Sequence, residues 1–455
     1  MMTFDRVLPE LIRLLHEEVG LNDAVTRFCI VRDVRGRVRL IVEPRAASPV
    51  PLGSLEANLE AIIGKYFVGP ILSAAHGGDV QRLAKQLLDQ ADGKWPGGWP
   101  RSFRNVLGGA DTSIETGTRW TGIERTIGKE AWLASSSVAP PWPLVKDKTP
   151  PIVTFHSFKG GVGRTTLVAA YAIRLATKKM SPKRVAIVDL DLEAPGVGSL
   201  LGVNPERGVL DVLIDHIATG EIDLDGASSS ATLQDGAGQK ITVFSAGRPD
   251  DSYVQKLARL DFSSVEPGKD NPVGLALEAM LRRMKPDYDV ILLDSRAGLH
   301  DLAGMSLHGL AHVDVLVFRG TEQNLLGLGQ TLRALGTREV TKLVLVETLL
   351  PASDEELFDT RRQRSRSRVY EMLCEHIYPD DDPPQLGDVG VPHDIVAVRR
   401  KEWLDGLDTL ENHVTAVLNE GDLKDVARRI NEECALGAED TEDADGDAND
   451  DEEDE

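Results

Sequence analysis

The pattern of apolar and polar residues divides the chain into two parts. In the first part, helical periodicities alternate with short strand-like runs, and the sequence Asp33-Val34-Arg35-Gly36 between two of these runs is a hairpin signal. The pattern predicts a small α+β domain over residues 1–134, whose role the sequence does not reveal. The predicted helices span 4–18, 55–66 and 79–91, and the strand-like or apolar runs span 27–31, 37–42 and 67–72.

From residue 152 onward, short buried strands alternate with helices. Such alternation is typical of an α/β fold, in which a parallel sheet is covered by helices on both faces. We expect this α/β domain to occupy residues 152–436, after a Ser/Pro-rich linker at 135–151. The predicted strands are Ile152–His156, Arg184–Asp189, Ile241–Ser245, Val290–Asp294, Val313–Arg319 and Lys342–Glu347.

Charge is concentrated at the carboxyl end. The chain of 455 residues has a net charge of −22, and residues 439–455 contribute twelve acidic and no basic side chains, which leaves −10 on the rest. We therefore expect residues 437–455 to form a disordered acidic tail, either solubilising or competing with nucleic acid for a basic surface. No apolar run is long enough for a membrane span and no signal pattern is present, so we expect a cytoplasmic protein without membrane contact.

The clearest chemical motif follows the first predicted strand of the α/β part. It reads Lys159-Gly160-Gly161-Val162-Gly163-Arg164-Thr165-Thr166 and precedes a good helix pattern. Glycines let backbone N–H groups wrap around phosphate, and the helix N-terminus adds a partial positive charge. Thr165 stands where a Mg²⁺ ligand is required, and Thr166 would reach an inner phosphate. The motif predicts a P-loop that binds a phosphate chain and Mg²⁺.

Acidic residues end two of the later predicted strands. Asp189 and Asp191 follow the strand 184–189, and Asp294 ends the strand 290–294. Ligands of open α/β sheets bind at the carboxyl ends of the strands, where these carboxylates would lie.

Together, these motifs resemble those of the ParA/MinD ATPases, of the SIMIBI class, whose deviant Walker A loop carries the extra lysine matched by Lys159. The resemblance implies that Lys159 reaches the ATP of a second subunit, so that ATP binding and homodimerisation are one event. It also implies that Asp191 positions the attacking water, that Asp189 lies near Mg²⁺, and that Asp294 holds Mg²⁺ through a water. The turn containing Pro392 is similar to the one that packs around adenine in relatives.

The chain departs from the usual motif at Arg164, where relatives have lysine, and in this it resembles a KGGVGR variant group. A guanidinium is planar and forked, so it does not copy an ammonium among phosphate oxygens. Three outcomes are open: Arg164 is a competent phosphate ligand, Lys159 takes over its work, or the site binds ATP and hydrolyses it slowly. We treat Lys159, Arg164 and Asp191 as the catalytic residues.

The resulting hypothesis is a slowly hydrolysing dimerisation switch that couples ATP to a protein complex, an effector or DNA, possible settings being partition or defence systems. The alternative is a scaffold that binds ATP and hardly hydrolyses it. A cluster of five arginines at Arg361–Arg368 is a candidate for non-specific DNA binding, or else a solvated helix face. The three widely spaced cysteines predict neither a disulfide framework nor a metal cluster.

Overall fold

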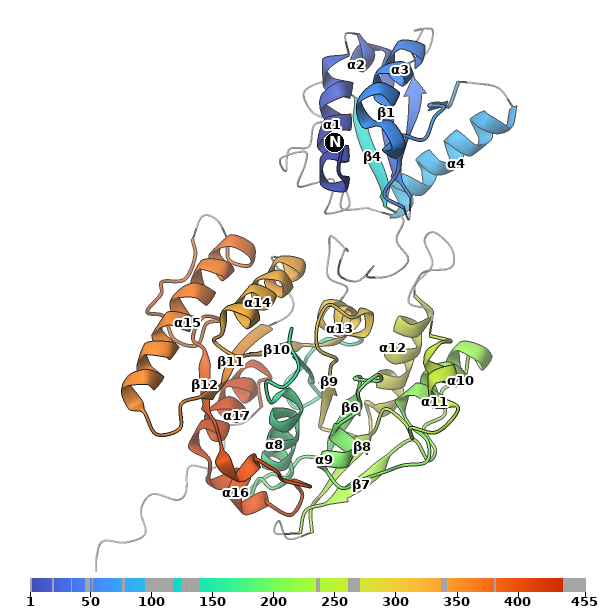
Figure 1. Cartoon of the computed structure of the whole chain (residues 1–455). Helices are drawn as coiled ribbons and strands as arrows, with labels where there is room; N and C mark the ends of the chain where they lie inside the picture. Colours follow the sequence, from blue (N-terminus) through green and yellow to red (C-terminus); the bar gives the residue numbers. More distant parts are fainter. Residues whose placement is uncertain are drawn as a thin grey trace, which may run out of the picture. The chain divides into compact units, whose positions relative to one another are not determined.

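The computed structural model falls into two compact units, one formed by the first 137 residues with 261–272 and one by the remainder (Figure 1). It describes residues 2–18, 20–33, 35–45, 50, 52–75, 78–94, 118–124, 129, 132, 139–234, 238–260, 271–336, 342–379 and 382–436.

The amino-terminal unit is a four-stranded mixed sheet with helices on both faces, in agreement with the predicted α+β domain. Its strand order is β3-β2-β1-β4, with β1 antiparallel to β2 and parallel to β4. The apolar side of α1 joins α3 in one core cluster, and α4 covers a second cluster. The elements are α1 (Phe4–Glu17), α2 (Leu21–Ala24), β1 (Val25–Arg32), β2 (Val38–Pro44), α3 (Leu52–Ile63), β3 (Leu72–Ser73), α4 (Gly78–Lys94) and β4 (Arg119–Glu124).

The second unit is built on an eight-stranded sheet in the order β12-β11-β10-β5-β9-β6-β8-β7. Every neighbouring pair is parallel except β7 with β8, so one antiparallel strand closes one edge. The strands are β5 (Ile152–His156), β6 (Val185–Asp189), β7 (Ser229–Thr232), β8 (Lys240–Phe244), β9 (Val290–Asp294), β10 (Val313–Phe318), β11 (Lys342–Leu350) and β12 (Val396–Arg399).

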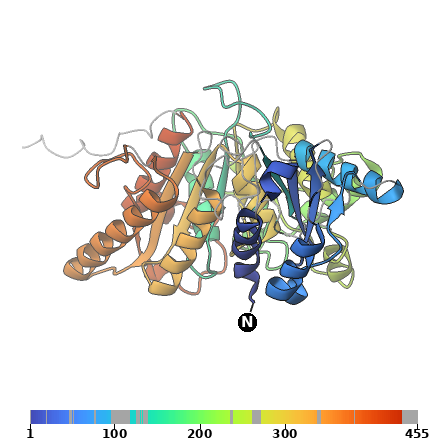
Figure 2. The same cartoon turned by 90° about the horizontal axis from the view of Figure 1, so that it is seen from above.

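Helices cover this sheet on both faces, which confirms the predicted α/β fold. On one face α8, α16 and α17 pack together over a continuous apolar core, and α14 and α15 lie on the other face (Figure 2). The helices are α8 (Arg164–Ala176), α9 (Val197–Leu200), α10 (Val209–Thr219), α11 (Tyr253–Leu257), α12 (Pro272–Met284), α13 (Asp301–Met305), α14 (Glu322–Leu335), α15 (Glu355–His376), α16 (Val414–Asn419) and α17 (Gly421–Glu433).

The described part of the predicted linker packs on this second unit. Trp142 is buried, and its indole N–H donates to the carbonyl of Pro150 at 2.8 Å. The Nε2 atom of His312 lies 2.7 Å from the carbonyl oxygen of Trp142, and its Nδ1 accepts from the backbone N–H of Ile152 at 2.9 Å. Residues 139–151 are therefore attached to the start of β5 by side-chain hydrogen bonds.

Candidate nucleotide site

The glycine-rich loop joins β5 to α8 at the carboxyl edge of the sheet. Gly161 and Gly163 have φ angles of 73° and 80°, which side chains rarely adopt, and Gly163 is the residue that precedes α8. A Cβ atom at Gly160, Gly161 or Gly163 would meet no atom within 4 Å, so the inner surface of the loop is open. Open backbone N–H groups at a helix N-terminus suit an anion such as a phosphate chain.

Arg164 is buried and binds two of the predicted carboxylates instead of projecting from the loop. Its Nε donates to Asp294 Oδ1 at 2.6 Å, and its Nη2 donates to Asp191 Oδ2 at 3.1 Å. Burial alone would lower the pKa of Arg164, but the charges of Asp294 and Asp191 raise it above its ordinary value. The forked guanidinium can bridge two carboxylates, which a single ammonium would do poorly.

Asp189 and Asp294 lie side by side because they end adjacent parallel strands in register. Thr165 Oγ1 donates to Asp294 Oδ2 at 2.8 Å, so the first turn of α8 is joined to β9. Burial, with the charge of Asp294 adding to it, raises the pKa of Asp189 to about 8. Burial also raises the pKa of Asp294, although Arg164 opposes this. Two carboxylates this close and this buried favour a cation between or beside them.

Asp189 also organises the loop that follows β6. Its Oδ1 accepts the backbone N–H of Asp191 at 3.0 Å, and its Oδ2 accepts the N–H of Gly196 at 3.2 Å. Both hydrogen bonds hold the turn that contains Asp191 and Glu193. We infer that Asp189 sets the position of Asp191 as well as contributing charge to the site.

Asp191 retains one oxygen for further contacts. Its Oδ1 is buried and accepts no hydrogen bond from the described residues, and Arg296 Nε lies 4.0 Å from it. Arg296 forms an ion pair with Glu193, whose Oε1 also lies 3.2 Å from His300 Nε2. These contacts join the loop after β6 to the loop after β9. The Arg296 side chain is partly buried and is paired with Glu193.

Lys159 is at the start of the loop and extends away from the buried carboxylates. Its side chain is exposed, and its Nζ lies 5.8 Å from the centre of the neighbouring Phe158 ring. It forms no ion pair with any residue that the structure describes. The Phe158 ring packs against α14 at Gly327, where an added Cβ would lie 2.1 Å from Phe158 Cδ1. The absence of a side chain at Gly327 therefore allows the Phe158 ring to pack on α14, and this packing fixes the backbone next to Lys159.

The late strand contributes a further contact. The Thr348 hydroxyl, on β11, donates to the carbonyl of Val162 at 2.7 Å, so β11 supports the middle of the glycine loop. Thr166 lies in the first turn of α8, next to Thr165. Pro392 is half-buried in the turn before β12, at the far edge of the sheet, and no contact among the described residues joins it to the glycine loop.

The donor set fits Mg²⁺ and a phosphate chain. Hydroxyl and carboxylate oxygens are the hard ligands that Mg²⁺ prefers, and Mg²⁺ commonly takes only one or two protein ligands beside phosphate oxygens and water. In keeping with this, no group of three His, Cys, Asp or Glu residues able to hold a metal ion occurs in the described part of the chain. The unpartnered Asp191 Oδ1 is suited to accept a hydrogen bond from a water molecule.

Comparison with known proteins identifies the type of site. No family model matches the sequence. The chain is 26% identical over 260 residues to the septum site-determining protein MinD of Helicobacter pylori, a match that covers 55% of this chain and 81% of that protein. The chain is therefore similar in sequence to a P-loop ATPase of the ParA/MinD type. The glycine loop and the carboxylates of this ParA/MinD-type chain stand in the order and on the elements that the sequence motifs predict.

Solved structures similar to this ParA/MinD-type chain include the cell division ATPase MinD of Pyrococcus furiosus, with 21% identity, 63% of this chain and 98% of that chain covered and a TM-score of 0.40. MinD of Pyrococcus horikoshii complexed with Mg-ADP has 18% identity, covers 62% and 98%, and has a TM-score of 0.38. A putative plasmid partition protein of Borrelia burgdorferi bound to AMPPNP has 16% identity, covers 62% and 98%, and has a TM-score of 0.40.

Sequence reasoning missed several residues that shape the site. The hydrogen bond from Thr348 to Val162 and the packing of Phe158 against Gly327 join positions far apart in the chain, and no local pattern marks them. The Glu193–Arg296 pair had a detectable signal, because opposite charges follow two strands that the pattern placed in one sheet. In the described residues, none of the helices has both the length and the apolar character needed to cross a bilayer.

Proposed function

We propose that this protein is an ATP-driven dimerisation switch with slow hydrolysis. The observation that carries the proposal is the position of Lys159, whose ammonium extends into solvent from the glycine loop without an ion-pair partner in the described residues. A cation in this position is available to the phosphates of a nucleotide held by a second copy. The negative charge of the nucleotide phosphates bound in one subunit would then be neutralised only in the dimer, so ATP binding and dimerisation are linked.

The remaining roles follow from the geometry. The glycine loop and Thr166 would hold the phosphates, and Thr165 and Asp294, with Asp189 nearby, would hold Mg²⁺. When bound, Mg²⁺ supplies positive charge that offsets the phosphate charge. Asp191 orients a water through its unpartnered Oδ1, while the Arg164 guanidinium occupies its Oδ2 and keeps that oxygen from the water. This arrangement favours low turnover.

Solution mass and phosphate release test the switch. We expect a dimer only when ATP and Mg²⁺ are present, and slow phosphate release. Lys159→Ala should abolish the ATP-dependent dimer, whereas Lys424→Ala, at an exposed position on α17, should not. Asp191→Ala should retain the dimer and lose phosphate release. A dimer that forms equally in Lys159→Ala would contradict the proposal.

A second candidate function is a scaffold that binds ATP and hardly hydrolyses it. The specific observation in its favour is the hydrogen bond from Arg164 to Asp191, because it competes for the carboxylate that the switch requires. The two functions differ in one measurement. The scaffold predicts an ATP-dependent dimer whose phosphate release is no faster in the native protein than in Asp191→Ala.

The partner of the switch is a protein complex, an effector or DNA. Non-specific DNA binding is supported by the arginines of α15, of which Arg361, Arg362, Arg364 and Arg368 are exposed. Exposed guanidinium groups along one helix bind phosphates without reading sequence, and such binding weakens steeply as salt rises. The double change Arg361→Glu with Arg362→Glu should reduce DNA retention at low salt. Unchanged retention across a salt series would leave a protein partner as the proposal.

A further inference from the structure

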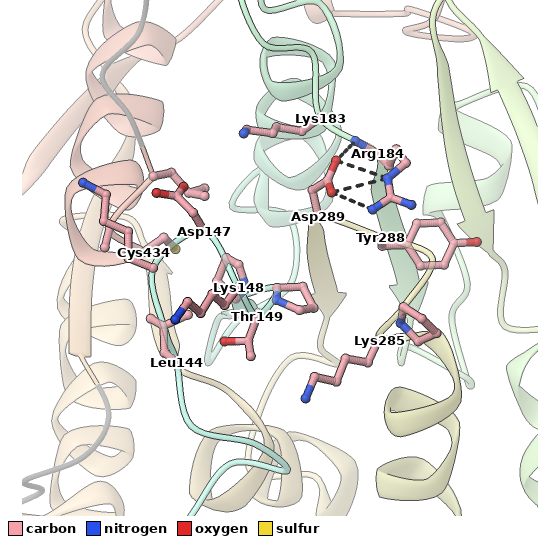
Figure 3. A pocket seen from close by; sticks show the side chains of 16 residues that line it. Leu144, Asp147, Lys148, Thr149, Lys183, Arg184, Lys285, Tyr288, Asp289 and Cys434 are labelled. Atoms are coloured by element: carbon pink, nitrogen blue, oxygen red, sulfur yellow. Dashed lines mark hydrogen bonds and ion pairs between the residues drawn. The ribbon is translucent and has the colours of Figure 1, made fainter.

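A basic pocket lies at the amino edge of the second sheet, at the opposite ends of the strands from the glycine loop. It encloses about 540 Å³ and lies beside the starts of β5, β6 and β9 (Figure 3). Five basic and two acidic side chains line it. Arg184 and Asp289 are paired, with Nη2 2.8 Å from Oδ1, so most of the unbalanced positive charge comes from lysines.

Four lysines supply this charge from three separate segments. Lys146 and Lys148 precede β5, Lys183 precedes β6, and Lys285 follows α12 (Figure 3). None of the four forms an ion pair with a residue that the structure describes. Lys183 donates to Ser181 at 3.2 Å, and Lys285 Nζ lies 5.2 Å from the centre of the Trp142 ring. Ammonium groups spread over a hollow suit a ligand with many separate carboxylates better than one compact anion.

The chain itself provides such a ligand. Cys434, Ala435 and Leu436 line the pocket, and the acidic segment of residues 439–455 begins three residues after Leu436. Because a chain spans at most about 3.3–3.6 Å per residue, its first carboxylates are held within about 15 Å of Leu436. Tethering over so short a distance gives an effective concentration of about millimolar or more.

We propose that this pocket, lined by Lys146, Lys148, Lys183 and Lys285, is the binding site for the protein's own acidic carboxyl-terminal segment, residues 439–455. The charges are complementary, and the segment starts at the pocket rim. The alternative receptor, the arginine cluster Arg361–Arg368 on α15, is on a different element and contributes no residue to this pocket. Binding at the pocket leaves those arginines available to other partners. The proposal is independent of the proposed switch.

A carbodiimide reaction on the full chain tests the contact directly, since it joins an amine to a carboxylate only when the two touch. We expect peptides from 439–455 to be joined to the four pocket lysines about tenfold more often than to Lys240 and Lys424, exposed lysines outside the pocket. Mixing isotopically labelled and unlabelled protein distinguishes contacts within one chain from contacts between copies. Equal joining to all exposed lysines, or joining mainly between copies, would overturn the proposal.

A titration separates the two candidate receptors. A labelled peptide of residues 437–455 is added to protein that ends at residue 436. We expect salt-sensitive binding that Lys148→Glu with Lys285→Glu weakens about tenfold, as the loss of several surface charge contacts predicts. The pair Arg361→Glu with Arg362→Glu should leave peptide affinity unchanged.

Thermal unfolding of each variant verifies that it is folded, which the exposure of Lys148 and the partial exposure of Lys285 favour. ATP affinity provides an independent readout, because the pocket is at the opposite edge of the sheet from the glycine loop and the lysine variants should bind ATP normally. The opposite ranking of the two variant pairs, or peptide binding that neither pair weakens, would refute the assignment.

Discussion

Replacing Arg164 by lysine restores the residue that relatives carry and removes the bridge between Asp294 and Asp191. In the structure, two nitrogens of one guanidinium bind the two carboxylates, at 2.6 Å and 3.1 Å. An ammonium is a compact charge on a flexible stem and would keep about one of these contacts. A hydrogen bond to a charged group contributes about 1.5–3 kcal/mol, so the free energy of unfolding should fall by about 2 kcal/mol.

The same change should accelerate hydrolysis. If Asp191 loses the competing donor, both of its carboxylate oxygens become available to orient the attacking water. If the activation free energy falls by about 1.4 kcal/mol, phosphate release becomes about tenfold faster. The assay is phosphate release under saturating ATP and Mg²⁺, together with urea unfolding of the same preparation.

A matched control lies on the same helix. Arg174 is also buried, but its Nη1 donates to the carbonyls of Val417 and Leu418 at 2.9 Å and 3.1 Å instead of to carboxylates. Arg174→Lys should therefore lower stability without altering turnover. If Arg164→Lys and Arg174→Lys lose stability alike and neither gains activity, the bridge does not restrain Asp191 and the reasoning fails.

Two further changes test other contacts of the site. Gly327→Ala would place a Cβ 2.1 Å from Phe158, so urea unfolding should show about 1–3 kcal/mol of destabilisation. Displacement of Phe158 should also move Lys159 and weaken the ATP-dependent dimer, which solution mass measures. An unaltered dimer would show that Phe158 does not position Lys159. Burial raises the pKa of Glu347 to about 7, and its Oε1 accepts from Ser365 at 2.9 Å. A raised pKa means that this carboxyl stabilises the fold below its unfolded pKa and that the contribution is lost as the pH rises through 7. Glu347→Gln should flatten the pH dependence of unfolding between about pH 4.5 and 7 and be the more stable form at pH 8, whereas an unchanged slope would contradict the assignment.

The hydrophobic pattern predicted most strands of the second sheet, but it missed strands at the sheet edges. All six strands expected in the second unit are present, because buried β-branched runs are a local signal. β7 was missed because Ser229–Thr232 is short and polar. β4, in the amino-terminal sheet, was missed because Trp120 and Ile123 are the two apolar side chains among its six residues, which is too weak a local signal.

The contacts within the site could also be predicted only in part from the sequence. The motifs placed Asp189 and Asp294 at the carboxyl edge, where the register of β6 and β9 brings them together. The bridge from Arg164 was not predictable, because it depends on how deeply the guanidinium is buried between two carboxylates that lie 27 and 130 residues away from it in the chain. The role of Asp189 in holding the backbone of Gly196 likewise depends on how the loop folds back.

The indole of Trp142 and the imidazole of His312 have a practical consequence for dissecting the protein. A fragment that starts at residue 152 would lack Trp142, so its buried indole would be lost and His312 Nε2 would no longer face the Trp142 carbonyl. The loss of a buried aromatic side chain typically costs about 3–5 kcal/mol, enough to unfold a marginally stable protein. A fragment meant to contain the second unit alone should therefore begin no later than residue 139.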